Sequence, residues 1–414
     1  NAEKYGIAVP GSATADFPAV LERGRRVRSE ISFHDSARRF RDHYGVDVFI
    51  GRGRFSGPNT VEVEGKTLRF RKAVVATGAR PVIPPIEGLR EAGFLTNETV
   101  FSLAELPARF LFIGGGPIGC ELSQAFARLG SRVTVVEMGK QFLPREDPEA
   151  AAILADALRR DGIDILLDTG VKRVTSDASP KLVQVESAGK IREIEADEIL
   201  VGAGRAPNVE GIGLEQAGVQ FDKFGIEVDD NLRTSNRRIF AAGDVALKHK
   251  FTHTADAAAR IVIQNALFPV NSKYSALTIP WTTYTDPEIA HVGMYEGEAR
   301  EAGIAVDTFK RAFKDVDRAL ADGEEEGFVK ILVRKGTDTI IGATVVARHA
   351  GEMISEISLA IVGGVGLRTI GKVIHPYPTQ AEAIKQLGDE YNRTRLTPSV
   401  KRALQRWFGL RRWR

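Results

Sequence analysis

The chain has 414 residues, which is enough for two or three domains of ordinary size. Its 57 basic and 54 acidic residues leave a net charge of +3, and this balance argues against nucleic acid as the main partner. No apolar run is long enough to span a bilayer. The single cysteine, Cys120, excludes an internal disulfide and a cysteine-rich metal site. No metal site is therefore expected, and a cytoplasmic setting is favoured.

The first part of the chain predicts helix followed by short strands. Residues 19–44 have a charged, helical pattern. Alternating or apolar segments predict strands at 46–50, 60–63, 67–71 and 72–77. The last of these is expected to be buried and ends at Gly78. The proline-rich segment 81–85 then marks a domain boundary.

The middle of the chain alternates strands and helices, which predicts a parallel, doubly wound α/β sheet. The expected elements are a strand at 110–113, a helix at 117–129, a strand at 132–137 and a helix at 148–160. The pattern changes near Ile279 and predicts a separate α+β domain. Its expected elements are strands at 329–333 and 340–346 and a helix at 350–361.

A glycine motif at 114–119 stands between the predicted strand and helix and matches GxGxxG. Gly114 permits a tight turn, Gly116 lets the backbone approach a pyrophosphate, and Gly119 lets helix and strand pack closely. The N-terminus of the helix then offers free N–H groups to phosphates. This context predicts a nicotinamide dinucleotide site. A glycine-rich turn without a ligand is the alternative.

Glu137 is expected at the end of the next strand. A carboxylate in this place accepts hydrogen bonds from the adenosine ribose hydroxyls and repels a 2′-phosphate. NAD(H) is therefore expected over NADP(H). Lys140 and Arg145 follow closely and oppose this preference, so NADP(H) stays an alternative. Glu137 as a solvated strand end is the other alternative.

A second motif places Asp244 after the predicted strand 239–242, at a strand end where ligands bind in open α/β sheets. From here the chain resembles the pyridine nucleotide-disulfide oxidoreductases. The motifs that carry the resemblance are Ala76-Thr77-Gly78-Ala79, Gly204-Arg205-Ala206-Pro207-Asn208, Ile239–Val245 and Tyr284–Glu288. They occur in the family's order over nearly the whole chain. The resemblance implies that Thr77, Gly78, Gly204 and Asp244 bind FAD.

The resemblance also implies the architecture. Two Rossmann-like domains, for FAD and NAD(P), are followed by a C-terminal α+β dimerisation domain, so a homodimer is expected. The expected boundaries are 1–80 and 207–275 for the FAD domain, 81–206 for the NAD(P) domain and 276–414 for the dimerisation domain. Glu121 corresponds to the family glutamate that pairs with a lysine near the flavin N5. A helix glutamate with a surface partner is the alternative.

The family begins with its own GxGxxG for the ADP moiety of FAD, followed by a CxxxxC redox disulfide and that lysine. The present sequence begins at Asn1 and carries none of these elements ahead of Thr77. We therefore expect that the sequence lacks the N-terminal part of its protein.

The segment His375–Glu382 resembles the catalytic segment of the family. In the family's thiol-exchanging enzymes a glutamate, here Glu382, orients a histidine base. Tyr377 stands at the histidine's position, and His375 lies two residues earlier. Because an unperturbed tyrosine keeps its proton until about pH 10, ordinary dithiol exchange is disfavoured. The alternatives are packing at the dimer interface for Tyr377 and an indirect role for His375.

The segment is closer to that of mercuric reductase, in which the tyrosine contacts the metal ion. The expected function is therefore an FAD-dependent NAD(P)H oxidoreductase that resembles mercuric reductase. Hydride would pass to the flavin and then to a disulfide, a dithiol or a metal ion. Mercuric reductase also has a C-terminal cysteine pair, which is missing here, so a small-molecule or metal-ion acceptor is left open. A dihydrolipoamide dehydrogenase, a soluble transhydrogenase-like enzyme and a redox-silent dinucleotide-binding protein are the alternatives.

The C-terminal segment 401–414 is basic and aromatic. Its residues of interest are Lys401, Arg402, Arg406, Arg411 and Arg412, with Trp407, Phe408 and Trp413 between them. Because the run is short, we expect its aromatic side chains to pack on the dimer. Contact with an anionic membrane surface is the alternative.

Overall fold

The structure is a computed structural model that describes residues 5–6, 14–175 and 180–411. The chain divides into two compact units, each assembled from separate stretches of sequence. Unit 1 is Asn1–Ser12, Lys140–Gly162 and Thr278–Arg414, and unit 2 is Ala13–Gly139 and Ile163–Leu277. Within the described part of the chain, no helix combines the length and apolar character that crossing a membrane requires.

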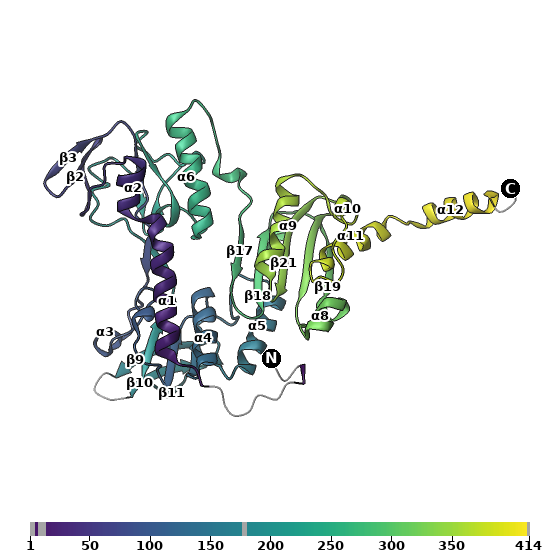
Figure 1. The fold of residues 1–414 in the computed structure, drawn as a ribbon, viewed down its shortest axis with the longest axis horizontal. Coiled ribbons are helices and arrows are strands. Elements are labelled where there is room, and N and C mark those ends of the chain that lie inside the picture. Colours follow the sequence, from purple (N-terminus) through teal and green to yellow (C-terminus); the bar gives the residue numbers. More distant parts are fainter. Residues whose placement is uncertain (1–4, 7–13, 176–179, 412–414) are drawn as a thin grey trace. The chain divides into compact units, whose positions relative to one another are not determined.

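Unit 2 contains a parallel sheet whose four strands lie in the order β12-β6-β7-β8, packed against the helix labelled α4 (Pro117–Leu129) in Figure 1. The strands are β6 (Arg109–Ile113), β7 (Arg132–Val136), β8 (Asp164–Leu166) and β12 (Glu198–Val201). The first of these four strands in the sequence, β6, lies between the second, β7, and the last, β12, so the winding direction reverses between β6 and β12. Ligands of doubly wound folds bind at such a switch point, beyond the carboxyl ends of the strands.

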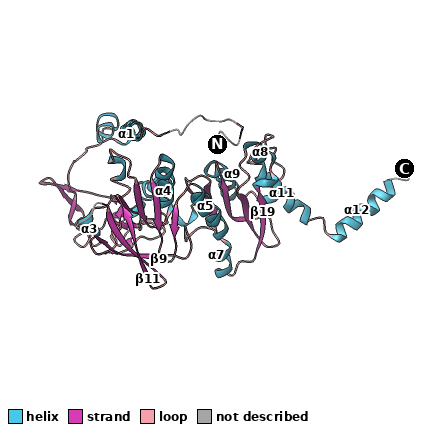
Figure 2. Ribbon diagram, turned by 90° about the horizontal axis from the view of Figure 1, so that it is seen from below, coloured by secondary structure: helices cyan, strands magenta, loops and turns pink. Residues whose placement is uncertain are grey.

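Both faces of this sheet are covered, which explains why residues 110–113 of β6 are all apolar. Helix α4 (Pro117–Leu129) covers one face, where the rings of Phe110 and Phe126 meet edge to face with centroids 4.9 Å apart. Leu111 points to the other face, into a hydrophobic cluster with Val174 and Val185 of a second sheet. This antiparallel sheet consists of β9 (Thr169–Thr175), β10 (Lys181–Ser187) and β11 (Lys190–Ala196) (Figure 2).

A second region of unit 2 joins segments that lie far apart in the sequence. Strand β4 (Ala73–Val75) pairs in parallel with β16 (Ile239–Ala241), and β5 (Ala79–Pro81) pairs antiparallel with β13 (Arg205–Pro207). The predicted strand at 72–77 is thus shorter than expected, and Val74 is 48% exposed because β16 is the sole strand paired with β4 in the described chain.

Smaller elements complete unit 2. They are α1 (Phe17–Ser32), η2 (Phe33–Asp35), α2 (Ala37–Tyr44), β1 (Arg54–Gly57), β2 (Thr60–Val63), β3 (Lys66–Arg69), α3 (Leu89–Ala92), η3 (Val100–Ser102), β14 (Phe221–Asp222), β15 (Gly225–Ile226), η4 (Gly243–Val245), α6 (Thr252–Leu267) and η5 (Tyr274–Ala276).

The predicted strand at 46–50 is wrong. These residues have no regular secondary structure, and Ile50 is 74% exposed. A strand needs a neighbour to receive its backbone hydrogen bonds, and the antiparallel sheet β1-β2-β3 starts only at Arg54. The helical stretch at 19–44 is likewise divided, because Ser36 begins α2 by accepting a hydrogen bond from the Arg39 amide at 3.2 Å.

Unit 1 is built on a five-stranded antiparallel sheet in the order β17-β18-β21-β20-β19. The strands are β17 (Pro280–Thr283), β18 (Glu288–Gly293), β19 (Val306–Ala312), β20 (Phe328–Arg334) and β21 (Ile340–Ala347). The helices are α5 (Pro148–Arg160), α7 (Glu296–Glu301), η6 (Phe313–Asp315), α8 (Asp317–Asp322), α9 (Ala350–Val362), α10 (Leu367–Ile370), α11 (Glu382–Thr394) and α12 (Pro398–Arg411).

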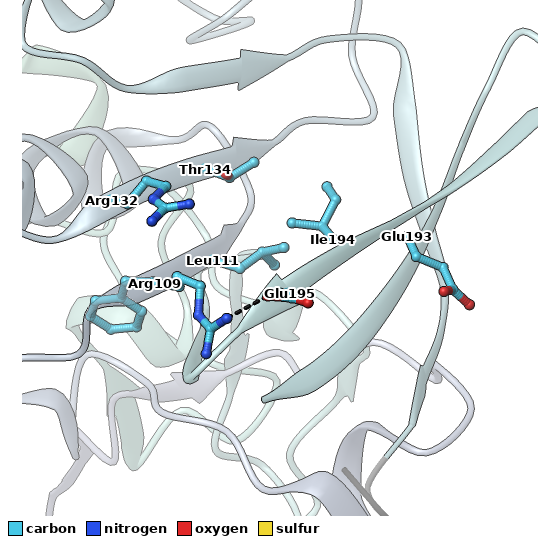
Figure 3. A pocket seen from close by; sticks show the side chains of 8 residues that line it. Arg109, Leu111, Arg132, Thr134, Glu193, Ile194 and Glu195 are labelled. Atoms are coloured by element: carbon cyan, nitrogen blue, oxygen red, sulfur yellow. Dashed lines mark hydrogen bonds and ion pairs between the residues drawn. The ribbon is translucent and has the colours of Figure 1, made fainter. Parts of the chain in front are cut away.

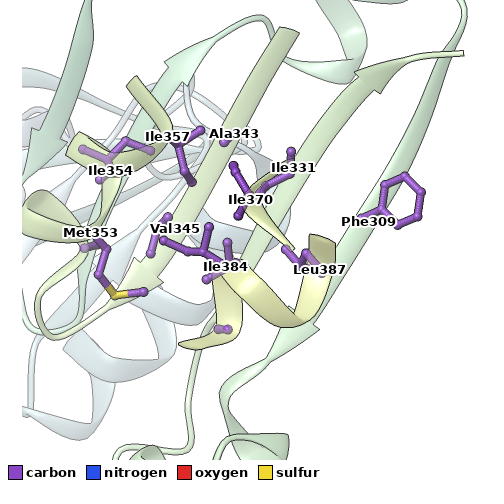
Figure 4. Packing of buried hydrophobic residues seen from close by; sticks show 14 of the residues in the cluster. Phe309, Ile331, Ala343, Val345, Met353, Ile354, Ile357, Ile370, Ile384 and Leu387 are labelled. Carbon is purple, nitrogen blue, oxygen red and sulfur yellow. The ribbon is translucent and has the colours of Figure 1, made fainter. Parts of the chain in front are cut away.

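The core of unit 1 lies between this sheet and helices α9 and α11. Ile357 of α9 and Ile384 and Leu387 of α11 are fully buried against Ile331 and Val345 of the sheet (Figure 4). Burying a side chain of this size stabilises the fold by about 1.5–3 kcal/mol. The architecture agrees with the predicted fold class: a mixed α/β region in unit 2 and an α+β domain in unit 1.

A buried polar cluster attaches the segment 140–162 to the same sheet. The Glu146 carboxylate accepts hydrogen bonds from Trp281 Nε1 at 2.8 Å and from the Tyr295 hydroxyl at 2.6 Å. Lys330 Nζ donates to Asp147 Oδ2 at 2.8 Å. Burial raises the pKa of Glu146, although the two hydrogen bonds from Tyr295 and Trp281 act against that rise. Residues 146–147 are thus bound to strands that come more than 130 residues later.

His291 lies beside this cluster and is 1% exposed. Its ring stacks on Tyr295 with centroids 3.6 Å apart. Its Nε2–H donates to the Gly293 carbonyl at 3.1 Å, so Nδ1 accepts from the Thr344 hydroxyl at 2.8 Å. Burial lowers the pKa of His291 from 6.5 to about 4. The imidazole is therefore neutral in the folded protein at neutral pH.

Candidate functional site

The turn between β6 and α4 lies at the switch point of the parallel sheet. Gly114 has a φ of +111°, and a Cβ there would lie 2.6 Å from the Gly202 carbonyl oxygen, just after β12. A Cβ on Gly119 would lie 2.1 Å from the carbonyl oxygen of Gly114. Both glycines are thus required by the packing of the turn itself, as expected for a chain that bends sharply from strand into helix.

Gly116 differs from its two neighbours in the motif. A Cβ placed there would have no atom within 4 Å, so the packing of the protein does not require a glycine. Gly116 is also the N-cap of α4, and it has no side chain with which to cap the first N–H groups of the helix. Open space beside uncapped N–H groups at a helix N-terminus suits the oxygens of a pyrophosphate.

Glu137 directly follows β7 and is bound to this turn. Its carboxylate accepts hydrogen bonds from the Gly115 amide at 2.7 Å and from the Gly139 amide at 2.6 Å. The side chain is half-buried at the carboxyl end of the sheet, beside the strand-to-helix turn. The three motif glycines and Glu137 are therefore brought together, and their arrangement fits a dinucleotide.

Helix α4 also carries Glu121 and Cys120. Glu121 is half-buried, two residues after Gly119, so it follows the glycine turn within the second turn of the helix. Cys120 is fully buried, and its Sγ lies 3.5 Å from the Gly115 carbonyl oxygen. This position is that of a small packing residue rather than an accessible nucleophile.

The two motifs around Thr77 and Asn208 bind one another at the ends of β4, β5 and β13. The Thr77 hydroxyl donates to the Asn208 carbonyl at 2.8 Å, and the Asn208 side-chain amide donates to the Thr77 carbonyl at 2.9 Å. The Asn208 backbone amide donates to the Gly78 carbonyl at 2.9 Å. Gly204, with a φ of +117°, accepts from the Val82 amide at 2.9 Å. Thr77, Gly78 and Gly204 thus lie at a crossover of the chain, where the segments leading to the paired strands β5 and β13 run side by side.

Asp244 belongs to the same region. It follows β16, whose partner β4 leads to Thr77, and its Oδ2 accepts from Arg205 Nε at 3.2 Å. Arg205 also donates to the Ala79 carbonyl at 2.9 Å, and Lys250 Nζ donates to the Asp244 carbonyl at 2.6 Å. Burial lowers the pKa of Lys250. A carboxylate with two cations at the ends of parallel strands fits a ligand that carries both hydroxyl and phosphate groups.

The predicted residues of the C-terminal segment lie in unit 1 and have separate partners. The Tyr377 hydroxyl donates to Asp317 Oδ2 at 2.8 Å, and this contact raises the pKa of Tyr377. The ring is 71% exposed. His375 Nε2 lies 3.0 Å from Glu356 Oε1 on α9. Glu382 is the first residue of α11. The described hydrogen bonds of His375 are with Glu356 and the Val373 carbonyl, and not with Glu382.

Several residues of these sites were missed by sequence reasoning. Arg205 and Asn208 lie within a motif that was recognised, but only Gly204 of that motif was singled out. Their side-chain partners lie 39 and 131 positions away, respectively. Glu356 and Asp317 lie in helices whose sequences carry no motif. A basic residue inside a ligand-binding motif is a signal that could have identified Arg205.

The surface hollow in Figure 3 lies elsewhere in unit 2. It measures about 260 Å³ and is lined by Arg109, Phe110, Leu111, Arg132, Thr134, Glu193, Ile194 and Glu195. Arg109 and Arg132 begin β6 and β7, so the hollow lies at the end of the strands opposite to the glycine turn. Its Arg109 is already bound to Asp197 at 2.6 Å. Among the described residues, no group of three or more His, Cys, Asp or Glu side chains is placed to hold a metal ion.

The chain is similar to proteins of one known family. Residues 10–260 match the family described as pyridine nucleotide-disulphide oxidoreductase, and residues 279–387 match the dimerisation domain of that family. The mercuric reductase of Bacillus cereus is 36% identical over 345 residues, which are 83% of this chain and 55% of that enzyme. The dihydrolipoyl dehydrogenase of Thermus scotoductus is 37% identical over 351 residues, 83% of this chain and 75% of that enzyme.

A solved structure is also similar. The HOCl-induced flavoprotein disulfide reductase RclA from Escherichia coli aligns with a TM-score of 0.83 at 28% identity, covering 91% of this chain and 86% of RclA. The chain spans only 55% and 63% of the lengths of two of the mercuric reductases that it matches. The family match nevertheless covers more than half of the chain. The chain belongs to the pyridine nucleotide-disulphide oxidoreductase family.

Proposed function

We propose that this protein is an FAD-dependent NAD(P)H oxidoreductase whose electron acceptor is a metal ion or a small molecule. The observation that supports the proposal is that unit 2 brings together two separate groups of the predicted site residues. One is the glycine turn with Glu137, and the other is the crossover that joins Thr77, Arg205 and Asp244. A protein that used a single nucleotide would need only one of them.

The residues of each site have separate tasks in this proposal. When bound, NAD(P)H supplies the hydride and FAD accepts it. The N–H groups at the start of α4 bind the pyrophosphate of the nicotinamide dinucleotide, and Glu137 receives its ribose hydroxyls. Thr77, Gly78, Gly204 and Asp244 hold FAD. In this proposal Glu121 would lie near the reacting rings, where its charge would influence the arrival of the hydride.

We further propose NADH as the preferred reductant, because Glu137 would lie close to a 2′-phosphate and repel it. The FAD domain would comprise residues 1–80 and 207–275, the NAD(P) domain residues 81–206, and the dimerisation domain residues 276–414. The parallel pairing of β4 with β16 supports the split FAD domain, since its two halves meet across the intervening sequence.

Tyr377 favours one chemical class of electron acceptor over another. Its hydroxyl is a hydrogen-bond donor to Asp317, and the raised pKa keeps it protonated at neutral pH. A protonated phenol cannot remove a proton from a thiol, which a dithiol substrate requires. An acceptor that needs no base, such as a metal ion, suits this residue better. In this proposal Tyr377 and Glu382 face the acceptor, and His375 acts indirectly through Glu356.

A dihydrolipoyl dehydrogenase activity is the second candidate, favoured by the 37% identity with the enzyme of Thermus scotoductus. It would require a base other than Tyr377. A steady-state assay with NAD⁺ and dihydrolipoamide separates the two candidates. Turnover comparable to that with a metal-ion acceptor would favour the dehydrogenase.

The test of the main proposal is the absorbance spectrum of the purified native protein, recorded without oxygen before and after addition of NADH. We expect a flavin spectrum that is bleached by NADH. Asp244→Ala should lower the flavin content, whereas Gly116→Ala should keep the flavin and slow its bleaching. Asp164→Asn, an exposed carboxylate of the same unit outside both sites, is the control. A colourless native protein that binds NADH would overturn the proposal and leave a redox-silent dinucleotide-binding protein.

A further inference from the structure

Helix α12 (Pro398–Arg411) stands out in unit 1 because none of its residues is buried. Trp407 is 55% exposed, Phe408 58% and Leu410 73%. The helix is drawn in yellow after α11 in Figure 1. Side chains this large and apolar are seldom left together in water by a folded protein. The exposed apolar side chains therefore indicate a binding partner, and the residue pattern of the helix indicates the chemistry of that partner.

The apolar residues of α12 share one face. They are Val400, Ala403, Leu404, Trp407, Phe408 and Leu410, which follow the helical spacing of three and four residues. Arg402 and Arg406 lie on the other side of the helix, and Lys401 lies at the edge of the apolar face beside Phe408. Arg411 lies on the apolar side of the helix, and its guanidinium is 5.3 Å from the centre of the Trp407 ring. The helix thus has an aromatic, apolar face flanked by cations.

The charge around this helix is of one sign. After Glu390 the chain has no acidic residue up to its last residue here. The basic residues in that stretch are Arg393, Arg395, Lys401, Arg402, Arg406, Arg411, Arg412 and Arg414. Arg412, Trp413 and Arg414 lie outside the described residues, so they enter only through their charge or side-chain type. A purely cationic segment with an apolar face complements a surface that is both anionic and apolar.

We propose that α12 binds flat on the surface of an anionic lipid bilayer, with Trp407 and Phe408 among the acyl chains and its basic residues at the headgroups. Amphipathic helices with basic and aromatic residues bind membrane interfaces in this way. The 14 residues of α12 extend about 21 Å, which is shorter than the roughly 30 Å of a bilayer core, so the helix lies on the membrane and does not cross it.

Two other partners fit the helix less well. Nucleic acid would match the cations, but it offers no apolar layer for the face that carries Leu404, Trp407 and Phe408. A second copy of this chain would bring two segments of like charge together. The match to the family's dimerisation domain also ends at residue 387, before α12 begins. The lipid surface is the partner that answers both the charge and the apolar face.

The experiment is sedimentation of the full chain with vesicles of phosphatidylcholine alone and of phosphatidylcholine with phosphatidylglycerol. We expect binding to the anionic vesicles that weakens as salt is added, because exposed charges are screened. Arg402→Gln with Arg406→Gln should lower the partition coefficient by about tenfold or more, since each basic residue near an anionic surface contributes to binding. Trp407→Ser with Phe408→Ser should lower it by a similar factor.

Lys223→Gln and Phe224→Ser provide matched controls. Both residues are exposed on the turn between β14 and β15, where Lys223 lies 5.0 Å from the Phe224 ring centre. Neither change should alter vesicle binding. Tryptophan emission gives a second measurement, because Trp281 is fixed by Glu146 and should not respond to vesicles. A blue shift that is lost in Trp407→Ser/Phe408→Ser supports the proposal.

Three results would overturn it. The first is no preference for anionic vesicles over neutral ones. The second is a purely electrostatic contact. It would show as binding that survives Trp407→Ser/Phe408→Ser, or as tighter binding to duplex DNA than to vesicles. The third is a change in oligomer mass in these variants, measured by light scattering, which would place α12 at a contact between copies. Thermal unfolding of each variant confirms that the fold is unchanged.

Discussion

Gly116 and Gly119 occur in one motif, yet they are required for different reasons. A Cβ at Gly119 would collide with the Gly114 carbonyl at 2.1 Å, whereas a Cβ at Gly116 would meet nothing within 4 Å. Gly119→Ala is therefore expected to destabilise the fold by about 1–3 kcal/mol, as overpacking does. Gly116→Ala should leave the free energy of unfolding unchanged and weaken NADH binding by about tenfold or more, because the methyl group occupies the phosphate's space. Urea denaturation and calorimetric titration measure the two effects.

Gly24→Ala is the control for these two changes. Gly24 lies within α1, and a Cβ there would have no atom within 4 Å. This substitution should stabilise the helix by about 0.5–1 kcal/mol and leave NADH binding unaltered. If Gly116→Ala and Gly119→Ala lost stability and binding in equal measure, the division of tasks within the motif would be wrong.

In the proposed function, the choice between NADH and NADPH depends on Glu137. Glu137→Gln keeps the shape of the side chain but removes the charge that repels a 2′-phosphate. We expect the ratio of the dissociation constants for NADPH and NADH to fall by about tenfold. Glu105→Gln, an exposed change in the same unit, should leave the ratio as it is. A ratio that stays constant in Glu137→Gln would assign the preference to other residues.

His291 makes the stability of unit 1 depend on pH. Its pKa is about 4 in the folded protein and about 6.5 in the unfolded chain, so the unfolded chain binds the proton first. The stabilisation is complete above pH 6.5 and is lost as the pH falls towards 4, by about 3 kcal/mol in total. His291→Gln keeps a donor for the Gly293 carbonyl but cannot be protonated. This substitution should therefore reduce the loss of stability as the pH falls.

The measurement is urea denaturation of both proteins at several pH values between 7.5 and 4. The raised pKa of Glu146 acts in the opposite direction, because there the folded protein binds the proton more tightly. This contribution is common to both proteins and cancels in the difference between them. Parallel curves for wild type and His291→Gln would refute the role given to His291.

At the level of elements, α9 buries one face and leaves the opposite one in water. Ile354 and Ile357 lie in the core, whereas Leu359 is 73% exposed and Val362 70%. An apolar face of this kind, in a domain that matches the family's dimerisation domain, supports a homodimer. Leu359→Asp with Val362→Asp is expected to weaken the dimer by about 100-fold without unfolding unit 1.

Light scattering at decreasing protein concentration measures this dissociation. Ile191→Asp is the control, because Ile191 is 65% exposed on β11 in unit 2. An unchanged mass for the α9 variant would remove the face of α9 from the dimer interface.

Elements with strong periodicity could be predicted to the residue. The helices at 117–129 and 148–160 have the predicted bounds, because a proline at the first position and a glycine or charged C-cap define both ends. The strand at 46–50 could not be judged from its alternation, since a strand also depends on a partner elsewhere in the chain. Likewise β4 is shorter than its apolar run, as its length is set by β16.

For the molecule as a whole, motifs predicted the positions of the candidate sites but not the side-chain contacts within them. The glycine turn and Asp244 were found because ligand chemistry restricts residue types at fixed spacing. The contacts of Asp244 with Arg205, and of Tyr377 with Asp317, depend on which distant segments meet. Such pairs carry no local pattern. The same is true of the two units, whose interleaved segments leave no mark in composition.

The attachment of residues 146–149 to unit 1 has a consequence for biosynthesis. A ribosome completes Glu146 and Asp147 long before it completes Trp281, Tyr295 and Lys330, to which they bind. During that interval unit 2 is also incomplete, because it includes residues up to Leu277. Over this interval the nascent chain carries carboxylates without these partners and incomplete sheets, a situation that slows folding and favours chaperone binding. Expression of residues 278–414 alone would leave Trp281 and Lys330 without these carboxylates.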